Sequence, residues 1–231
     1  ASPQSVKIYQ PPYTLSREGE KSVTLQCEQD NDEYLYMFWY KHTDFRQMQL
    51  LTYSINKGIQ TTEAPFNETK FFMSRPEVRN SSLSVLFDIK LVHCATYEAY
   101  FGAGTKLTVL DRNIERPKVK VFKPSAKECQ NDKHKKNKKT LLCVASDFYP
   151  DHVNVSWQID GVDVKDGVAT DHSAHWNGTH YRITSRLRVL FSQWFKPGKN
   201  FTCTVNFFDG KQIVPYVGWV TGIRSMFIYN P

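Results

Sequence analysis

The chain has 231 residues, of which 40% are hydrophobic and 14% aromatic, and its formal net charge is +7. No apolar run approaches the roughly eighteen residues of a membrane helix and no signal peptide opens the sequence, so we expect a mature ectodomain of one or two domains, or a fragment of one. Residues 1–110 have a net charge of −1 (11 Lys and Arg against 12 Asp and Glu), and residues 111–231 have +8 (19 against 11). Part of this excess lies in residues 133–139 (KHKKNKK), which contain no aromatic side chain for base stacking. We therefore predict a solvated loop there and no nucleic-acid partner.

The first half of the sequence predicts antiparallel strands. In residues 22–27 (SVTLQC), Val23, Leu25 and Cys27 share one face and polar side chains share the other, and residues 82–87 (SLSVLF) begin with the same alternation. A period of two indicates strands with one wet face. Trp39 follows Cys27 by 12 residues, and Cys94 follows Cys27 by 67 residues. This Cys–Trp–Cys spacing is typical of a β-sandwich in which a disulfide crosses between two sheets and the Trp packs against it.

The second half repeats the pattern. Trp157 follows Cys143 by 14 residues, and Cys203 follows Cys143 by 60 residues. In residues 184–189 (TSRLRV), apolar side chains alternate with arginines. We therefore predict an all-β fold class of two tandem immunoglobulin-type β-sandwiches. The longer first interval has room for the extra strand pair of a variable-type domain, and the second fits a constant-type domain.

Residues 111–117 (DRNIERP) are charged and end in Pro, which indicates a linker. We accordingly divide the chain into a variable-type domain at residues 1–110, the linker at 111–117, a constant-type domain at 118–223 and a C-terminal tail at 224–231.

The cysteines and glycosylation sequons indicate an oxidising compartment. No cysteine lies in a CxxC spacing, and the two long intervals predict the disulfides Cys27–Cys94 and Cys143–Cys203. N-x-S/T sequons are more numerous than chance predicts for this length, which favours a secreted or surface glycoprotein. The glycosylation candidates are Asn67, Asn80, Asn154, Asn177 and Asn200.

Several segments resemble the T-cell receptor β chain, and the resemblance covers nearly the whole chain. Residues 37–42 (MFWYKH) look like a β variable domain, residues 101–110 (FGAGTKLTVL) look like a joining segment, and residues 140–155 (TLLCVASDFYPDHVNV) look like a β constant domain. FYPDHV is the most specific of these motifs, whereas FGxG is shared with antibody light chains. We expect the two glycines of FGAG to allow a β-bulge. The sequence departs from mammalian relatives by a short DG turn at Asp209 in place of a long insertion, which favours a non-mammalian source.

The resemblance implies a function. It predicts a cell-surface antigen-receptor chain that pairs with a T-cell receptor α chain, recognises a peptide–MHC or MHC-like ligand, associates with invariant signalling subunits and has a membrane anchor beyond Pro231. A γ-type or light-chain-like chain is one alternative, against which FYPDHV speaks. A germline-encoded adhesion or invariant receptor is another, against which the joining-type segment speaks.

Three loops lie at one end of a variable-type sandwich, and the spacing places them at residues 29–36, 54–60 and 95–100. Tyrosines in these loops suit a binding surface, although surface loops of other proteins also contain them. The third loop is short, so we expect the first two to supply most of the antigen contact. The candidate antigen-binding residues are Asp30, Asn31, Asp32, Glu33, Tyr34, Tyr36, Ser54, Ile55, Asn56, Lys57, Thr96, Tyr97 and Glu98.

The resemblance also predicts a surface for the partner chain. We expect His42, Leu51 and Phe101 to face the partner variable domain. If His42 is buried there in its neutral form, pairing should weaken below about pH 6, because an ordinary imidazole has a pKa of about 6.5. Cys129 is the odd cysteine and lies in a connection near the partner constant domain, so it is either an interchain bridge or an exposed thiol.

The remaining motifs give no support for catalysis or cofactors. The acidic residues Asp30, Asp32 and Glu33 lack the ordered spacing of a calcium loop. His172, His175 and His180 lie near a sequon in a segment that lacks a closed zinc ligand set. No GxSxG motif is present. We expect a binding protein that is not an enzyme and needs neither metal nor cofactor.

Overall fold

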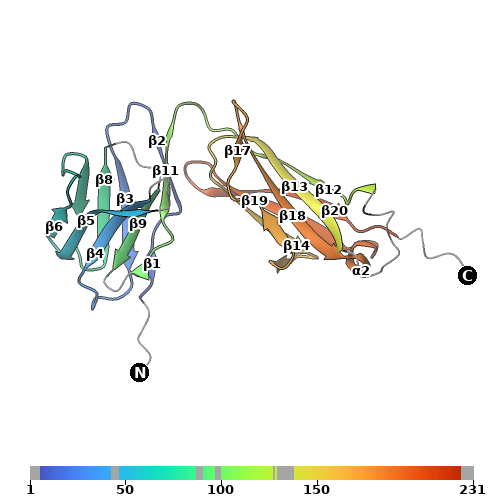
Figure 1. Cartoon of the computed structure of the whole chain (residues 1–231), viewed down its shortest axis with the longest axis horizontal. Coiled ribbons are helices and arrows are strands. Elements are labelled where there is room, and N and C mark those ends of the chain that lie inside the picture. Colours follow the sequence, from blue (N-terminus) through green and yellow to red (C-terminus); the bar gives the residue numbers. More distant parts are fainter. Residues whose placement is uncertain are drawn as a thin grey trace, which may run out of the picture. The chain divides into compact units, whose positions relative to one another are not determined.

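The computed structural model of the chain describes residues 6–42, 47–86, 91–96, 100–126, 128 and 138–224 (Figure 1). The chain forms two compact units, Ala1–Arg112 and Asn113–Pro231. Within the described residues each unit contains two β-sheets, so the predicted all-β fold of tandem immunoglobulin sandwiches is confirmed. No helix in these segments has the length and hydropathy to cross a membrane.

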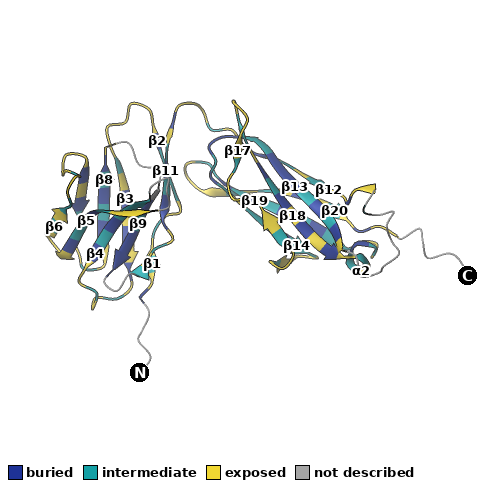
Figure 2. Ribbon diagram, in the orientation of Figure 1, coloured by how far each residue is buried: buried dark blue, intermediate teal, exposed yellow. Residues whose placement is uncertain are grey.

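The first unit contains two sheets, and in strands such as β3 and β8 buried residues alternate with less buried ones (Figure 2). Among the described residues, one sheet has the order β1 (Ile8–Tyr9), β3 (Val23–Gln29), β8 (Asn80–Val85) and β7 (Phe71–Ser74). The other has the order β2 (Tyr13–Arg17), β11 (Thr105–Leu110), β9 (Leu91–Thr96), β4 (Met37–His42), β5 (Met48–Asn56) and β6 (Ile59–Thr62), with β10 (Tyr100–Phe101) also paired to β9.

The second unit is also a sandwich of two sheets. Over its described residues, one sheet has the order β12 (Lys118–Phe122), β13 (Lys138–Phe148), β18 (Tyr181–Leu190) and β16 (Val168–Thr170), with β17 (His175–Trp176) paired to β18. The other has the order β15 (Val162–Val164), β14 (Val153–Ile159), β19 (Asn200–Phe208) and β20 (Ile213–Thr221). The helix α2 (Phe191–Trp194) follows β18 and buries Trp194. The DG turn is tight as expected, because Asp209 N donates to the carbonyl of Gln212 at 3.1 Å.

A disulfide and a tryptophan join the two sheets of the first unit. Cys27 is bonded to Cys94, and the fully buried Trp39 is the cross-strand neighbour of Cys94. The Trp39 indole N–H crosses the core and donates to Ser81 Oγ at 3.1 Å, and Ser81 is itself the cross-strand neighbour of Cys27. The polar edge of the buried indole is therefore satisfied where the ring packs on the disulfide.

The second unit uses the same arrangement. Cys143 is bonded to Cys203, and Trp157 is the cross-strand neighbour of Cys203. Its indole N–H donates at 2.9 Å to the hydroxyl of Ser185, which lies opposite Cys143. The Cys–Trp spacing indicated both bridges between sheets, but it contained no sign of the two serines.

The first strand of the chain changes sheets. β1 pairs antiparallel with β3, and after Gln10 and two prolines the chain continues as β2, which pairs parallel with β11 in the other sheet. At the crossing, the Gln10 amide donates to the Val92 carbonyl at 3.0 Å and accepts from the Cys94 N–H at 3.3 Å. The side chain therefore replaces a strand partner where proline provides no N–H.

Lys139 corrects the expectation of a solvated lysine run. Its side chain is fully buried in β13, its ammonium donates to the carbonyl of Glu128, and it lies 5.6 Å and 5.9 Å from the ring centres of Phe191 and Phe195. Aromatic faces attract a cation, so this lysine packs with its charge partly satisfied inside the fold. Lys138 is exposed, and residues 133–137 lie outside the described residues.

Arg75 holds the base of the first two predicted binding loops. It is 2% exposed, and its guanidinium donates to backbone carbonyls, those of Leu35, Tyr34 (3.4 Å), Ser54 (3.1 Å) and Val78 (2.8 Å). Burial lowers the pKa of Arg75 to about 10, so the group remains charged at neutral pH. One buried cation therefore binds segments that are distant in sequence.

Gln29 supports the same place from β3. It is fully buried, and its amide donates to the Tyr34 carbonyl at 2.6 Å and to the Val78 carbonyl at 3.0 Å. The first loop therefore starts from a backbone that two buried side chains fix. Loops used for recognition gain affinity when their conformation is set before binding.

We predict that Arg75→Met destabilises the first unit by about 2–4 kcal/mol, because buried carbonyls then lose their charged donor. Urea unfolding followed by tryptophan fluorescence measures this. Arg79→Met is the matched control, since Arg79 is exposed and pairs with the exposed Asp32, and it should change the free energy of unfolding little. Equal effects of the two substitutions would contradict the role given to Arg75.

Candidate functional site

The first predicted loop is exposed above its buried base. Asp30, Asp32, Glu33 and Tyr36 are exposed, and Asn31 and Tyr34 are half-buried. Asp32 makes two contacts of 2.8 Å with Arg79, and this pairing holds the pKa of the Asp32 carboxyl below its usual range.

The acidic residues of this loop are engaged by the protein itself. Asp30 Oδ1 accepts the Lys7 N–H at 2.8 Å, and Asn31 Oδ1 accepts the Glu33 N–H at 2.9 Å. Among the described residues, no group of three or more His, Cys, Asp or Glu side chains is placed to hold a metal ion.

The second loop is a hairpin tip between β5 and β6. Ile55 and Lys57 are exposed, Asn56 is half-buried, and Gly58 has a positive φ of 73° that favours glycine. The Lys57 N–H donates to Asn56 Oδ1 at 2.7 Å, which orders the tip. Ile55 is 42% exposed and Ile59, which sequence reasoning did not select, is also exposed. This hairpin therefore presents apolar side chains to solvent.

Two of the predicted antigen-binding residues were wrong. Ser54 and Thr96 are both buried, and both are cross-strand neighbours of the core residue Met37, so their side chains point into the sandwich. The Ser54 hydroxyl donates to the Asn56 carbonyl at 2.6 Å. The loop ranges included these residues because spacing alone does not say where the strand's core-facing positions end.

The structure describes only the two ends of the third loop, residues 95–96 and Tyr100. Tyr97 and Glu98 lie outside the described residues. Tyr100 begins β10 and packs edge-to-face on Tyr34 of the first loop, with ring centroids 5.9 Å apart. Aromatic pairs of this geometry are favourable beyond the area that they bury. The first and third loops are therefore in contact at their bases.

A row of aromatic side chains covers the outer face of the sheet beneath the loops. Tyr36, Phe38 and Tyr40 alternate with the buried Met37 and Trp39. Tyr36 stacks on Phe38 with centroids 6.1 Å apart, and the centroids of Phe38 and Tyr40 are 6.2 Å apart. Burial raises the pKa of Tyr40.

The aromatic row widens onto the neighbouring strands. Phe38 stacks on Tyr53 of β5 with centroids 6.1 Å apart, and Tyr40 contacts Phe101 of β10 at 5.5 Å. Phe101, a predicted partner residue, is 47% exposed. We call Tyr36, Phe38, Tyr40, Tyr53 and Phe101 the aromatic face. Sequence reasoning selected only its two ends, although the period of two from Tyr36 to Tyr40 could have indicated the rest.

Leu51 was wrongly assigned to this face. It has no exposed surface and belongs to the core. The register between β4 and β5 shifts after Trp39, which pairs with Thr52, so that Tyr40 pairs with Leu50. This bulge turns Leu51 inward and places half-buried Leu50 beside Tyr40 on the outer face.

Two histidines lie at the end of the aromatic face that is farther from the loops. His42 is half-buried, and its ring centroid is 6.3 Å from that of His93 on β9. Burial lowers the pKa of His93, and nearby His42 lowers it further, while the Gly102 carbonyl 3.5 Å from His93 Nδ1 opposes the shift. His93 was not recognised from the sequence.

The glycines of the FGAG motif fit tightly around these groups. The chain between β10 and β11 is irregular, and Gly104 has a φ of 87°. A β-carbon on Gly104 would lie 2.5 Å from His93 Cε1, and one on Gly102 would lie 2.8 Å from Gln10 Oε1. Any larger residue at Gly104 would therefore both strain the backbone and displace His93.

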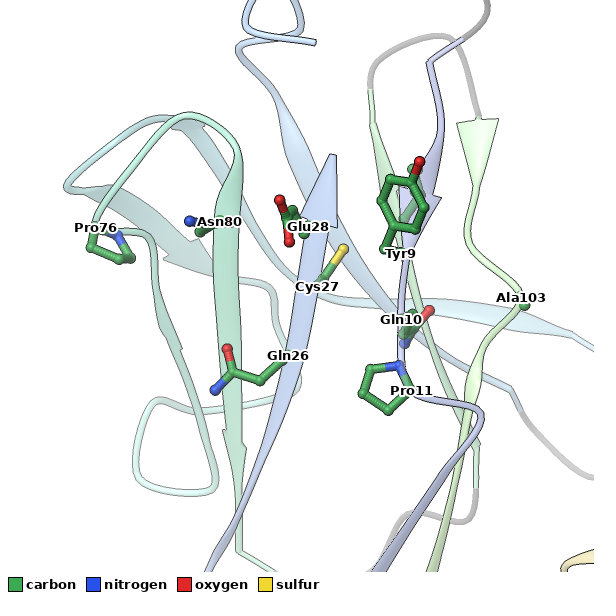
Figure 3. Close-up of a pocket in the computed structure, with 10 residues that line it drawn as sticks. Tyr9, Gln10, Pro11, Gln26, Cys27, Glu28, Pro76, Asn80 and Ala103 are labelled. Atoms are coloured by element: carbon green, nitrogen blue, oxygen red, sulfur yellow. The ribbon is translucent and has the colours of Figure 1, made fainter. Parts of the chain in front are cut away.

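The opposite sheet of the first unit has a shallow hollow of mixed polar and apolar lining. Figure 3 shows Glu28 between Asn80 and Tyr9, which follows from the register, because Glu28 pairs with Tyr9 on one side and with Asn80 on the other. Asn80 is a predicted glycosylation site and is exposed at the edge of this hollow. A glycan there would lie on the sheet that faces away from the aromatic face.

The other sequons lie at the surface. Asn67, Asn154 and Asn177 are exposed, and Asn200 is half-buried at the start of β19. Asn67 and Asn177 each accept the hydroxyl of their sequon threonine, at 2.6 Å and 3.0 Å. Cys129 lies outside the described residues.

The second unit matches a known domain family. Residues 119–209 match the immunoglobulin C1-set domain. The constant region of the T-cell receptor β-2 chain of Mus musculus is 43% identical over 97 residues, which are 42% of this chain and 54% of that protein. The match therefore spans about half the length of that constant region.

Relatives that span both units are T-cell receptor proteins. A crystal structure of a chicken TCR matches with a TM-score of 0.80 and 32% identity, over 94% of this chain and all of that chain. A viral protein of feline leukemia virus that is described as T-cell receptor beta chain-like is 34% identical over 226 residues, which are 90% of this chain and 68% of that protein. With two disulfide-bridged sandwiches and a relative of this extent, the chain belongs to the T-cell receptor β chain family.

Proposed function

We propose that the chain is one half of a heterodimeric antigen receptor, whose aromatic face pairs with a T-cell receptor α chain and whose loops bind a peptide–MHC or MHC-like ligand. Its relatives are receptor chains, and the chain itself is not an enzyme. The aromatic face carries this proposal, because five aromatic rings in contact, with Phe101 half exposed, form a surface of the kind that a partner protein covers.

The pairing surface and the ligand surface are adjacent in this proposal. Tyr36 belongs to both the first loop and the aromatic face, and Tyr34 connects the first loop to the end of the third. A partner variable domain seated on the aromatic face would bring its own loops beside these. The ligand would then contact a composite surface, with no chemistry performed on it.

Further parts of the proposal follow from membership of the family. We place the chain at the cell surface, with a membrane anchor beyond Pro231 and invariant signalling subunits as further partners. A glycan on Asn80 would leave the aromatic face clear, since Asn80 lies on the opposite sheet. Cys129 remains a candidate for an interchain disulfide.

Pairing can be tested by co-expressing the chain with an α chain of the same source and capturing the heterodimer. We predict that Phe101→Asp reduces its yield at least tenfold, because a charge would be buried in an apolar interface. Phe72→Asp is the matched control, since Phe72 is 50% exposed on β7 of the opposite sheet and should leave the yield unchanged. If the α chain is not captured at all, a receptor that acts without α becomes the better hypothesis.

Ligand recognition can be tested in reporter cells that display the heterodimer and respond to presenting cells of the same source. Ile55→Ala and Tyr34→Ala should each weaken the response, by about tenfold in the antigen dose, because truncating an anchor costs more than 1 kcal/mol. Tyr9→Ala, at an exposed tyrosine of the opposite sheet, should have no effect. A response that depends only on the third loop would overturn the predicted dominance of the first two.

His93 should make the stability of the first unit depend on pH. Its folded-state pKa is lowered by burial, so between that pKa and the unfolded value of about 6.5 the unfolded chain binds more protons. The free energy of unfolding should therefore fall as the pH falls below about 6.5, and His93→Phe should abolish that part of the loss. Urea unfolding between about pH 5 and pH 8 measures it. His172→Gln, in the second unit, serves as the control, and an unaltered slope in His93→Phe would contradict the assignment.

A further inference from the structure

The edge strand β20 exposes an apolar stripe on the outer face of the second unit. Along β20 the side chains alternate, and the outward positions include Ile213, Val217 and Trp219. These are 50%, 48% and 64% exposed, respectively. Such a stripe at the edge of a sheet favours non-specific association unless something covers it.

A glycosylation sequon lies on the neighbouring strand. Asn200 and Thr202 are outward-facing positions of β19, where they alternate with the buried Phe201 and Cys203. In the register between the two strands, Thr202 lies directly opposite Trp219 and Asn200 lies opposite Thr221. Trp219 is therefore the diagonal neighbour of Asn200, at a distance of roughly 7–8 Å between backbone positions.

This spacing suits a sugar ring better than a side-chain contact. An N-linked glycan begins with N-acetylglucosamine on the Asn nitrogen, and one face of its ring presents C–H groups. Those groups pack on an aromatic face, as other apolar groups do, while the hydroxyls at the ring's edge remain in water. Asn200 Oδ1 is buried, so the glycan-bearing side chain also has limited freedom to turn away.

We propose that the first N-acetylglucosamine of a glycan on Asn200 stacks on the indole of Trp219 and covers the Trp219 end of the apolar stripe of β20. This rests on the glycosylation proposed above. The glycan would then shield this part of the sheet formed by β14, β19 and β20 from contact with other proteins.

A second sequon on the same sheet provides a matched comparison. Asn154 is exposed on β14, and its cross-strand neighbours are Asn206 on β19 and, beyond it, Pro215 on β20. Its diagonal neighbour Phe208 is half-buried and already stacks on His152, with centroids 6.3 Å apart. A glycan on Asn154 thus lies on the same face without reaching Trp219.

The test uses the full chain expressed in glycosylating cells. Mass spectrometry first establishes whether Asn200 is occupied, and hydroxyl-radical footprinting then measures oxidation of Trp219. We expect Trp219 to be protected several-fold in the glycosylated chain relative to Asn200→Gln, and equally protected after an endoglycosidase trims the glycan to one N-acetylglucosamine. Asn154→Gln should leave the oxidation of Trp219 unchanged.

Two results would overturn the proposal, and they are distinguishable. An unoccupied Asn200 removes its premise, whereas an occupied Asn200 with Trp219 oxidised as in Asn200→Gln refutes the stacking alone. Thermal unfolding provides a second measurement that does not depend on footprinting. Removing the glycan by Asn200→Gln should lower the melting temperature of the chain with Trp219 but not that of the Trp219→Ala variant.

Discussion

In each unit the structure depends on one bridge between its two sheets, made of a disulfide, a buried tryptophan and a serine. The tryptophan lies beside the second cysteine, and its N–H donates across the core to a serine beside the first. A disulfide alone would fix one point between the sheets. The ring fills the space around that point, and its hydrogen bond removes the cost of an unpaired buried donor. Because side chains alternate between the two faces of a strand, the residues of this bridge fix which positions of the flanking strands point inward.

The aromatic face of the first unit follows from the inward position of Trp39. With Trp39 fixed inward on β4, the residues on either side of it, Phe38 and Tyr40, must point outward, where they contact neighbouring rings in the aromatic face. Above this face, buried Arg75 and Gln29 hold the backbone from which the first two loops begin. A rigid sheet and rigid loop bases reduce the conformational entropy that binding must overcome.

The expectations for four residues failed for one shared reason, which is that burial depends on register and not on position in the chain. Ser54 and Thr96 fall within loop-like segments, yet both pair with Met37 and point into the core. Leu51 points inward because of a bulge in the pairing of β4 with β5, which the alternation of residues along β5 does not predict. Lys139 ends a run of lysines that suggests solvent, but β13 begins there and turns its side chain toward Phe191 and Phe195.

The sequence by itself determined the fold class, the two Cys–Trp–Cys cores and the family resemblance. These features depend on local alternation and on residue spacings, both of which can be read directly from the sequence. It also indicated that Phe101 and much of the first loop would be exposed. Only the tertiary structure decided which residues meet across strands: Ser81 with Trp39, His93 with His42, Arg75 with the carbonyls of two loops, and the sequon of Asn200 with Trp219. Such pairs lie far apart along the chain, and a shift of one residue in register reverses the face to which each side chain points.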